Sequence, residues 1–234
     1  MRKRRAVVVF TVGAVVLTLL GGAMPRMIEE SAPLLATYTE NNQTSDTTPI
    51  EKGSAREGLE ALAVKGRAPK TGYERAQFGE GWSKLNGCST RDIILNRDLK
   101  DVVIDEECKV VSGVLEDPYT ATQILFSKEN SSKVQIDHVV ALSDAWQKGA
   151  QQLTKEKRVQ LANDPLELLA VDGPANQQKS DGDAATWLPK NKAFRCEYVA
   201  RQISIKRKYE LWVTQAEKDA IISALGVCPS QTLP

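Results

Sequence analysis

The N-terminal segment restricts where this chain can fold. Four basic residues, Arg2 to Arg5, precede an uncharged apolar run over residues 6–24. A basic region followed by an apolar region is the pattern of an export signal, but this run is nearly long enough to span a bilayer, which takes about 17–25 residues. The sequence therefore predicts export of everything after residue 24. Cleavage and retention as an N-terminal anchor both stay open, and membrane contact is expected only through residues 6–24 if they are retained.

All four cysteines lie beyond this segment, and their number is even. They are Cys88, Cys108, Cys196 and Cys228. In an oxidising compartment this predicts two disulfides, for which three connectivities exist. We favour Cys88–Cys108 with Cys196–Cys228, because this pairing closes the shortest loops. Four free thiols or a zinc site are the alternatives, and the absence of C-x-x-C spacing argues against zinc.

The remaining chain divides into a linker and one domain. Residues 25–54 are polar and without periodicity, which is typical of a disordered linker. Residues 55–234 have the length of one ordinary domain. The net charge is +1 for the whole chain and +1 − 4 = −3 without residues 1–24, so composition excludes a generally basic nucleic-acid-binding protein.

Helical and extended patterns are mixed along this domain, which predicts an α+β fold. Helices are expected over 55–64 and 90–99, in the strings LSDAWQKGAQQ and TKEKRVQLAN, and from about 190 to 225. A β-hairpin is expected over 109–115 and 121–126, with its turn at Asp117-Pro118-Tyr119. The strings VQIDHVVAL and PLELLAV are strand candidates, and a short helix is expected in DGPANQQKSDG.

The chain has one histidine, His138, which stands beside Asp137 in the first of those strand candidates. Asn163 precedes the second strand candidate, and Asn176 and Lys179 share one face of the short helix that follows. A strand–strand–helix order can bring these polar groups to one point. Neighbouring residues on a regular strand point to opposite faces, so Asp137 and His138 can serve one site only if the strand ends or bulges there.

The pattern I-D-H-V … N … A-N-Q-Q-K-S-D resembles that of the HNH (His-Me finger) nucleases, whose ββα-metal motif holds one divalent cation. The strings DHVVALSDAW and DGPANQQKSDGDAATWLP, with the tail from Cys196 to Cys228, extend the resemblance to about residues 55–228. Over this length the chain is similar to secreted HNH nuclease-like proteins of Gram-positive bacteria. The resemblance implies an α+β fold on a ββα-metal (His-Me finger) core, to which the additional helices, the β-hairpin and the two disulfides are attached.

The resemblance also implies roles for the polar residues. His138 would be the general base, Asp137 and Asn176 would hold the metal, and Asn163 would orient the base or brace its loop. Lys179 is expected to contact phosphate or to steady the transition state. Magnesium prefers oxygen ligands, so Mg²⁺ is the expected ion, with Mn²⁺ or Ca²⁺ as alternatives. With the lone histidine assigned as base no nitrogen ligand remains, which argues against zinc.

Two groups of basic residues are candidates for contact with nucleic acid. Arg91 and Arg97, in the helix expected over 90–99, either form ion pairs that fix the fold or face phosphate. Seven basic residues and one glutamate between 190 and 208 give a local charge of 7 − 1 = +6. Such a run is usually a solvated face, but here we interpret it as a track for the phosphate backbone that reads little sequence. The residues assigned to this track are Lys190, Lys192, Arg195 and Arg201, with Lys206, Arg207 and Lys208 in the same run.

The predicted function is an exported, metal-dependent nuclease that hydrolyses phosphodiester bonds of DNA with little sequence specificity. RNA is the alternative substrate, and no obligate protein partner is expected. The first rival is a non-catalytic extracytoplasmic nucleic-acid-binding module on the same fold. The second is a structural envelope protein tethered by residues 6–24, in which the polar groups form a core network. Trp82, Tyr119, Trp146 and Trp187 are expected in the core, and Asp181 and Asp183 in solvent.

Overall fold

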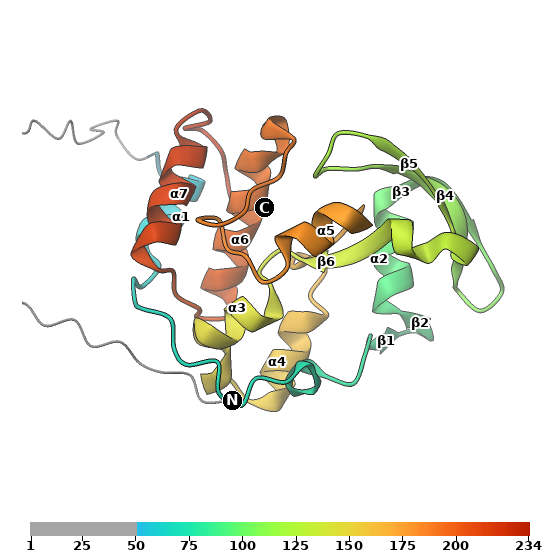
Figure 1. Cartoon of the computed structure of the whole chain (residues 1–234), viewed down its shortest axis with the longest axis horizontal. Coiled ribbons are helices and arrows are strands. Elements are labelled where there is room, and N and C mark those ends of the chain that lie inside the picture. Colours follow the sequence, from blue (N-terminus) through green and yellow to red (C-terminus); the bar gives the residue numbers. More distant parts are fainter. Residues whose placement is uncertain (1–50) are drawn as a thin grey trace, which may run out of the picture. The chain divides into compact units, whose positions relative to one another are not determined.

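Small antiparallel sheets and short helices make up residues 51–234, the part of the chain that this computed structural model describes (Figure 1). The expected export segment, and the expected linker up to residue 50, lie outside the described residues. The helices are α1 (Ala55–Glu60), α2 (Thr90–Asp98), α3 (Leu142–Gln147), α4 (Lys155–Ala162), α5 (Gly173–Lys179), α6 (Arg195–Lys208) and α7 (Gln215–Leu225). The 3₁₀ helices are η1 (Arg75–Phe78), η2 (Lys128–Lys133), η3 (Ala150–Gln152) and η4 (Lys192–Phe194). The strands are β1 (Lys84–Leu85), β2 (Cys88–Ser89), β3 (Leu99–Ile104), β4 (Val110–Glu116), β5 (Gln123–Ser127), β6 (Val134–His138) and β7 (Leu168–Asp172).

Most of the expected elements are present, with two differences. The hairpin is confirmed as β4 and β5, but β3 pairs with β4 as a third strand that was not expected. In β3 only Leu99 is buried, so its sequence lacks the alternation that marks a strand. The helical region expected from about 190 to 225 is confirmed but divided into two main helices, because α6 ends at Lys208, Glu210 adopts a positive φ of 54°, and Thr214 caps α7.

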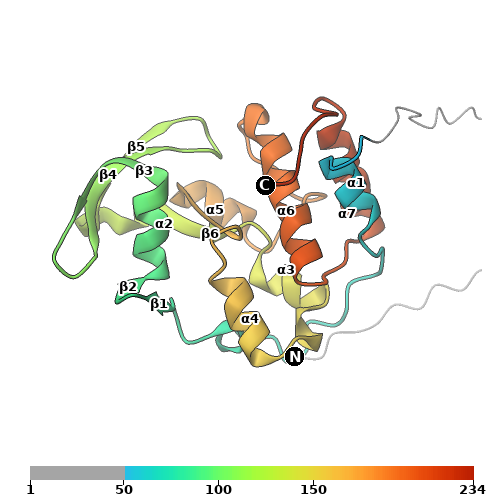
Figure 2. The ribbon, with the colours of Figure 1, turned by 180° about the vertical axis from the view of Figure 1, so that it is seen from behind.

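The antiparallel pair β6–β7 lies between two hydrophobic cores. Val134 and Ile136 of β6, with Leu168 and Ala170 of β7, face a core that includes α2 and the sheet β3–β5. Leu169 and Val171 of β7 face the other core, which includes α3, α6 and α7. Seen from behind, α2 stands between the β3–β5 sheet and β6 (Figure 2). Side-chain alternation therefore sends neighbouring residues of β6 into different cores.

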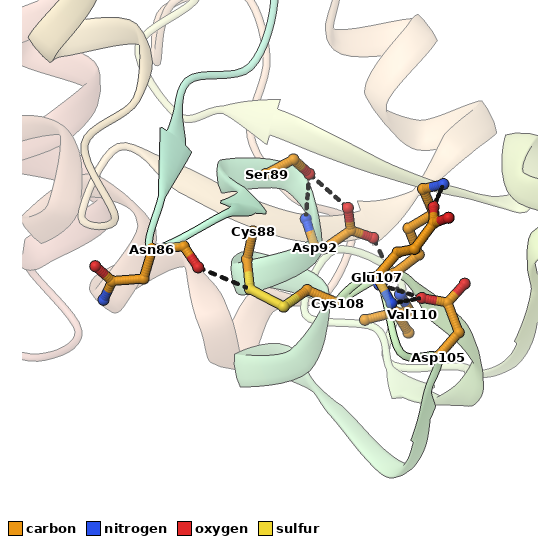
Figure 3. Close-up of a disulfide and its surroundings, with 9 residues drawn as sticks. Asn86, Cys88, Ser89, Asp92, Asp105, Glu107, Cys108 and Val110 are labelled. Carbon is orange, nitrogen blue, oxygen red and sulfur yellow. Dashed lines mark hydrogen bonds and ion pairs between the residues drawn. A yellow bond between two sulfur atoms is a disulfide. The ribbon is translucent and has the colours of Figure 1, made fainter.

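The expected disulfide pairing is confirmed: Cys88 is joined to Cys108 and Cys196 to Cys228. The first bond ties the start of α2 to the turn before β4 (Figure 3). Beside it the Ser89 hydroxyl caps α2 by accepting from Asp92 N, and the Asp92 carboxylate accepts from Val110 N at 3.1 Å. The second bond ties the first turn of α6 to the chain that follows α7.

A group of six charged side chains, five of them buried, joins α3, α6 and α7 to three positions outside these helices. We call it the charge cluster; its members are Arg67, Asp144, Lys148, Asp183, Lys206 and Glu217. Lys148 Nζ lies 2.7 Å from Asp183 Oδ2 and 2.6 Å from Glu217 Oε2, and Lys206 Nζ lies 2.9 Å from Glu217 Oε1. Arg67 lies 2.7 Å from both Asp144 and Asp183. Asp183 is therefore buried and not in solvent as expected, and Lys206 does not belong to a surface track.

Removing the first disulfide is expected to destabilise the domain. In Cys88→Ser/Cys108→Ser the open loop spans 20 residues, and the entropy of closing such a loop corresponds to about 3 kcal/mol of unfolding free energy. Urea unfolding of the variant and of the wild type, followed by circular dichroism, measures the difference. An unchanged midpoint would show that the hydrogen bonds of Asp92 and Ser89 hold this corner without the bond between the sulfur atoms.

Candidate functional site

The strand β6 ends at His138, which pairs with Leu168 in regular register. Asp137 and His138 could serve one site only if the strand ended or bulged there. The strand does end at this point, and it has no bulge. Asp137 and His138 nevertheless have different neighbours: Asp137 contacts Tyr119 and Lys179, whereas His138 contacts Trp82 and the carbonyl of Ala162. Both side chains border one cavity of about 540 Å³ at this end of the strand.

The imidazole of His138 is held on two sides. Its Nε2 lies 3.0 Å from the carbonyl oxygen of Ala162. A carbonyl can only accept, so Nε2 carries the hydrogen, and the lone pair of the neutral ring is on Nδ1. Within residues 51–234, Nδ1 makes no hydrogen bond. Trp82 stacks on the ring with centroids 5.7 Å apart and planes 5° apart. Trp82 therefore belongs to the site, whereas Tyr119 and Trp146 are core residues as expected.

Burial lowers the pKa of His138 from its ordinary value of 6.5 to about 3. Loss of hydration is the largest cause, and the positive charges of Arg75 and Lys179 act in the same direction, while the hydrogen bond to Ala162 opposes them. The ring is 7% exposed. His138 is thus neutral at pH 7 and able to accept a proton, although weakly until a negative charge approaches it.

The carboxylate of Asp137 is neutralised inside the protein. Lys179 Nζ donates to Asp137 Oδ1 at 2.9 Å and to the carbonyl of His138 at 2.7 Å, and the Tyr119 hydroxyl donates to Asp137 Oδ2. Lys179 is 1% exposed. This burial argues against the expected contact between Lys179 and phosphate. Its position indicates instead that Lys179 joins α5 to the end of β6 and fixes the Asp137 carboxylate.

Asn163 is the C-cap of α4 and braces a neighbouring loop. Its Oδ1 accepts from Ser83 N at 2.9 Å, and its Nδ2 donates to the carbonyl of Val159 at 3.0 Å. Ser83 follows Trp82, and Ala162, which binds His138, precedes Asn163. The expected supporting role therefore agrees with these contacts: Asn163 positions two of the groups that hold the His138 ring and makes no hydrogen bond to the ring itself.

Asn176 borders the same cavity from α5. Its Nδ2 donates to Gln135 Oε1 at 3.0 Å, and its Oδ1 has no hydrogen bond to the described residues. Asp137 and Asn176 together offer carboxylate and amide oxygens, the donors that Mg²⁺ prefers, and Mg²⁺ often takes only one or two protein carboxylates. Among residues 51–234 there is no group of three or more His, Cys, Asp and Glu side chains suited to a metal. The donor set fits a hard ion held mainly by water and phosphate, and it does not fit zinc.

The basic residues that were expected to contact nucleic acid differ in whether they border the cavity. Arg91 borders the cavity and donates to the carbonyl of Val134 at 3.2 Å. Arg97 does not border it: its guanidinium pairs with Asp98 and donates to the carbonyls of Pro165 and Leu168. Arg97 thus takes the fold-fixing role that was its alternative.

The expected basic track does not reach the cavity. Arg195 donates to the carbonyl of Pro189, and Arg201 pairs with Glu197 on α6 and donates to the carbonyl of Leu166. Lys190 and Lys192 are exposed. None of these four residues borders the cavity that holds His138. A contact between this face and nucleic acid would therefore have to lie beside the site and not within it.

Sequence reasoning missed several residues that do border the cavity. Lys70, Tyr73 and Arg75 come from the chain before β1, and Gln135 comes from β6. The string GRAPKTGYERAQFGEGW, over residues 66–82, is rich in turn formers and aromatics and has no periodicity that would place it beside His138. Its basic residues, Arg67, Lys70 and Arg75, indicate a positively charged segment but not its place in the fold.

Comparison with known proteins adds a family to this geometry. Residues 89–224 match the family described as GmrSD restriction endonucleases, C-terminal domain. The chain belongs to this family. It is also 37% identical over 178 residues to a protein of Arthroderma benhamiae described as "Uncharacterized secreted protein"; the match covers 75% of this chain and 85% of that protein. No solved structure matches the chain.

Family membership establishes a nuclease-related endonuclease domain, for which nucleic acid is the substrate. The Arthroderma relative is described as a secreted protein, which agrees with the predicted export of this chain. A Gram-positive bacterial origin stays a prediction. Across residues 51–234, no helix has both the length and the apolar character that crossing a bilayer requires. The anchor considered for residues 6–24 lies outside the described residues.

The ion pair of Lys179 is expected to be important for stability. In Lys179→Met the Asp137 carboxylate stays buried without its partner, which typically costs about 3–5 kcal/mol. Urea unfolding measures the loss, with Lys192→Met as the control because Lys192 is exposed and has no ion pair among the described residues. Equal midpoints for the two variants would contradict the assignment of Lys179 as the partner of Asp137.

The lowered pKa of His138 predicts how stability depends on pH. Between about pH 6.5 and pH 3 the unfolded chain binds a proton at His138 that the folded protein excludes, so stability is complete above this window and falls as the pH is lowered through it. Relative to His138→Gln, the wild type should lose about 1.4 kcal/mol per pH unit below pH 6. Urea unfolding of both proteins at pH 7, 5.5 and 4.5 measures this difference. A difference that stays constant with pH would show that the ring is not buried in the neutral form.

Proposed function

We propose that this chain is an exported HNH-type nuclease that hydrolyses phosphodiester bonds, with His138 as general base. The observation that carries the proposal is the fixed tautomer of His138. Its Nε2 is committed to the Ala162 carbonyl, which leaves the Nδ1 lone pair of a ring that borders a cavity with Asp137 and Asn176. Membership in an endonuclease family supports the reaction class.

In the proposed reaction the oxygen of a water molecule attacks phosphorus while its proton passes to Nδ1 of His138. The bond from phosphorus to the leaving oxygen breaks, and that oxygen takes up a proton. The low pKa of His138 suits this cycle when substrate is bound, because the negative phosphate favours the protonated ring and raises its pKa. Trp82 and the Ala162 carbonyl keep the ring in one orientation throughout.

Asp137 and Asn176 are the proposed ligands of a divalent cation, Mg²⁺ in the first instance, with Mn²⁺ or Ca²⁺ as alternatives. When bound, such an ion neutralises phosphate oxygens and stabilises the leaving oxygen. Lys179 fixes the Asp137 carboxylate in this arrangement. Its ammonium lies 2.9 Å from one oxygen of that carboxylate, so the carboxylate alone is a weakened ligand, and strong binding of the ion is expected only when substrate phosphate is present.

The proposed substrate is DNA, with RNA as the alternative. Lys70, Arg75 and Arg91 border the cavity and are suited to phosphate contacts, which position a nucleic acid without reading its sequence. We therefore expect cleavage with little sequence specificity. Export is proposed from the basic and apolar N-terminal pattern, the two disulfides and the relative described as secreted.

The rival is a non-catalytic nucleic-acid-binding module on the same fold. Two observations favour it to some degree: His138 is almost fully buried, and Lys179 already neutralises Asp137. A protein of this kind would retain nucleic acid at low salt and leave it intact. The second rival, a structural envelope protein, would not retain nucleic acid at all.

Cleavage of supercoiled plasmid and of RNA tests the proposal. The oxidised protein is expected to cut in Mg²⁺, and His138→Ala is expected to cut about 10²–10⁴-fold more slowly, the usual cost of losing a general base. EDTA should abolish cleavage, and Asn176→Ala should require more Mg²⁺ for the same rate. Lys157→Ala, which alters an exposed lysine of α4 away from the cavity and outside the basic run, is the matched control.

Retention of plasmid without cleavage in Mg²⁺, Mn²⁺ or Ca²⁺ would favour the binding module. Equal rates for the wild type and for His138→Ala would remove His138 from the mechanism.

A further inference from the structure

Arg75 is a basic residue at the site to which the structure gives no internal partner. It begins η1 and borders two cavities that share His138, one of about 540 Å³ and one of about 140 Å³. Its guanidinium makes no ion pair and no hydrogen bond with another residue of the described part. By contrast Arg97, Arg158 and Arg201 each donate to backbone carbonyls.

The backbone that carries Arg75 is nevertheless well fixed. Phe78, at the other end of η1, is buried and lies 6.4 Å from the Trp146 ring. Arg158 of α4 donates from Nε to the carbonyl of Gln77 and from Nη2 to its side-chain oxygen, both at 3.0 Å. A cation is therefore placed beside the base on an anchored turn, while its own charge stays uncompensated.

An uncompensated guanidinium in this position is suited to one class of ligand. It has five N–H donors in a planar fork that matches two oxygens of a phosphate. The carboxylate nearest to the base in sequence, Asp137, is already held by Lys179 and Tyr119. The other carboxylate that borders the cavity, Asp181, is paired with Lys70 at 3.1 Å and accepts from the Ser143 hydroxyl. The unpaired charge that Arg75 can meet in the cavity is thus that of the substrate.

We propose that Arg75 binds the scissile phosphate and stabilises the charge that develops on its oxygens; this inference rests on the proposed function. Arg91 differs from it, because one guanidinium nitrogen of Arg91 already donates to the carbonyl of Val134. Arg75 also lies before residue 89, outside the residues that match the endonuclease family. The family match alone would therefore not identify it.

The test compares Arg75→Ala and Arg75→Lys with the wild type on two substrates. Plasmid DNA has many phosphates, whereas bis(p-nitrophenyl) phosphate has only the one that is cleaved. Arg75→Ala is expected to lower kcat/KM about 10²-fold on both, the order of magnitude for losing one donor to a developing oxyanion. Arg75→Lys keeps the charge without the fork and is expected to retain part of the activity. Lys157→Ala is the control, because Lys157 is exposed on α4, lies outside the basic run over 190–208 and does not border the His138 cavity.

The possible outcomes distinguish a failure of this inference from a failure of the proposed nuclease function on which it rests. A wild type that cleaves neither substrate nor RNA overturns the proposed function and this inference together. A wild type that cleaves while Arg75→Ala cleaves equally well overturns the inference alone. A loss on plasmid without a loss on bis(p-nitrophenyl) phosphate also overturns it, because Arg75 would then bind a flanking phosphate. Unfolding of each variant at the same midpoint temperature as the wild type would confirm that the variants are folded.

Discussion

The arrangement of this domain depends on the charge cluster. Lys148 and Lys206 are fully buried, and each is compensated by carboxylates from other elements. A buried ion pair contributes little net stability compared with apolar packing, but a buried charge without its partner is very unfavourable. The cluster therefore determines chiefly how the helices pack, because all six charges are paired only when α3, α6 and α7 lie together. Arg67 and Asp183 extend this constraint to the chain on either side of the site, toward the segment of Arg75 and the end of α5.

The site is built by a second, smaller set of interactions in which each group holds another. Lys179 fixes Asp137 and the His138 carbonyl, Ala162 fixes the His138 ring, and Asn163 braces the residue that follows Trp82. Most of these partners are backbone carbonyls or buried side chains. Three groups have no partner among residues 51–234 and border the same cavity: Nδ1 of His138, Oδ1 of Asn176 and the Arg75 guanidinium. This division between satisfied and unsatisfied groups is the physical basis of the functional proposal.

Much of this was accessible from the sequence, for identifiable reasons. The helix over 90–99, the hairpin and the strand that carries His138 follow local rules of helix patterning, alternation and turn chemistry, and the disulfide pairing followed from loop length. Contacts between distant segments were not accessible. The basic run over 190–208 could not show that Lys206 is buried against Glu217, nor that Arg201 is engaged with Glu197 and a carbonyl. Trp82 and Arg75 reach His138 only through tertiary folding, and no local pattern in their segment indicates it.

The alternation of β6 has a further consequence. Asp137 is held by Tyr119 and by Lys179 of α5, whereas His138 is held by Trp82, which packs against the core of α2, and by the Ala162 carbonyl at the end of α4. The two halves of the proposed catalytic centre therefore depend on different structural units that meet at the β6–β7 pair. A slight sliding of one unit on the other would misalign proton acceptor and carboxylate while every helix remained folded. On this geometry, the alignment of the two groups is a requirement separate from the stability of the fold.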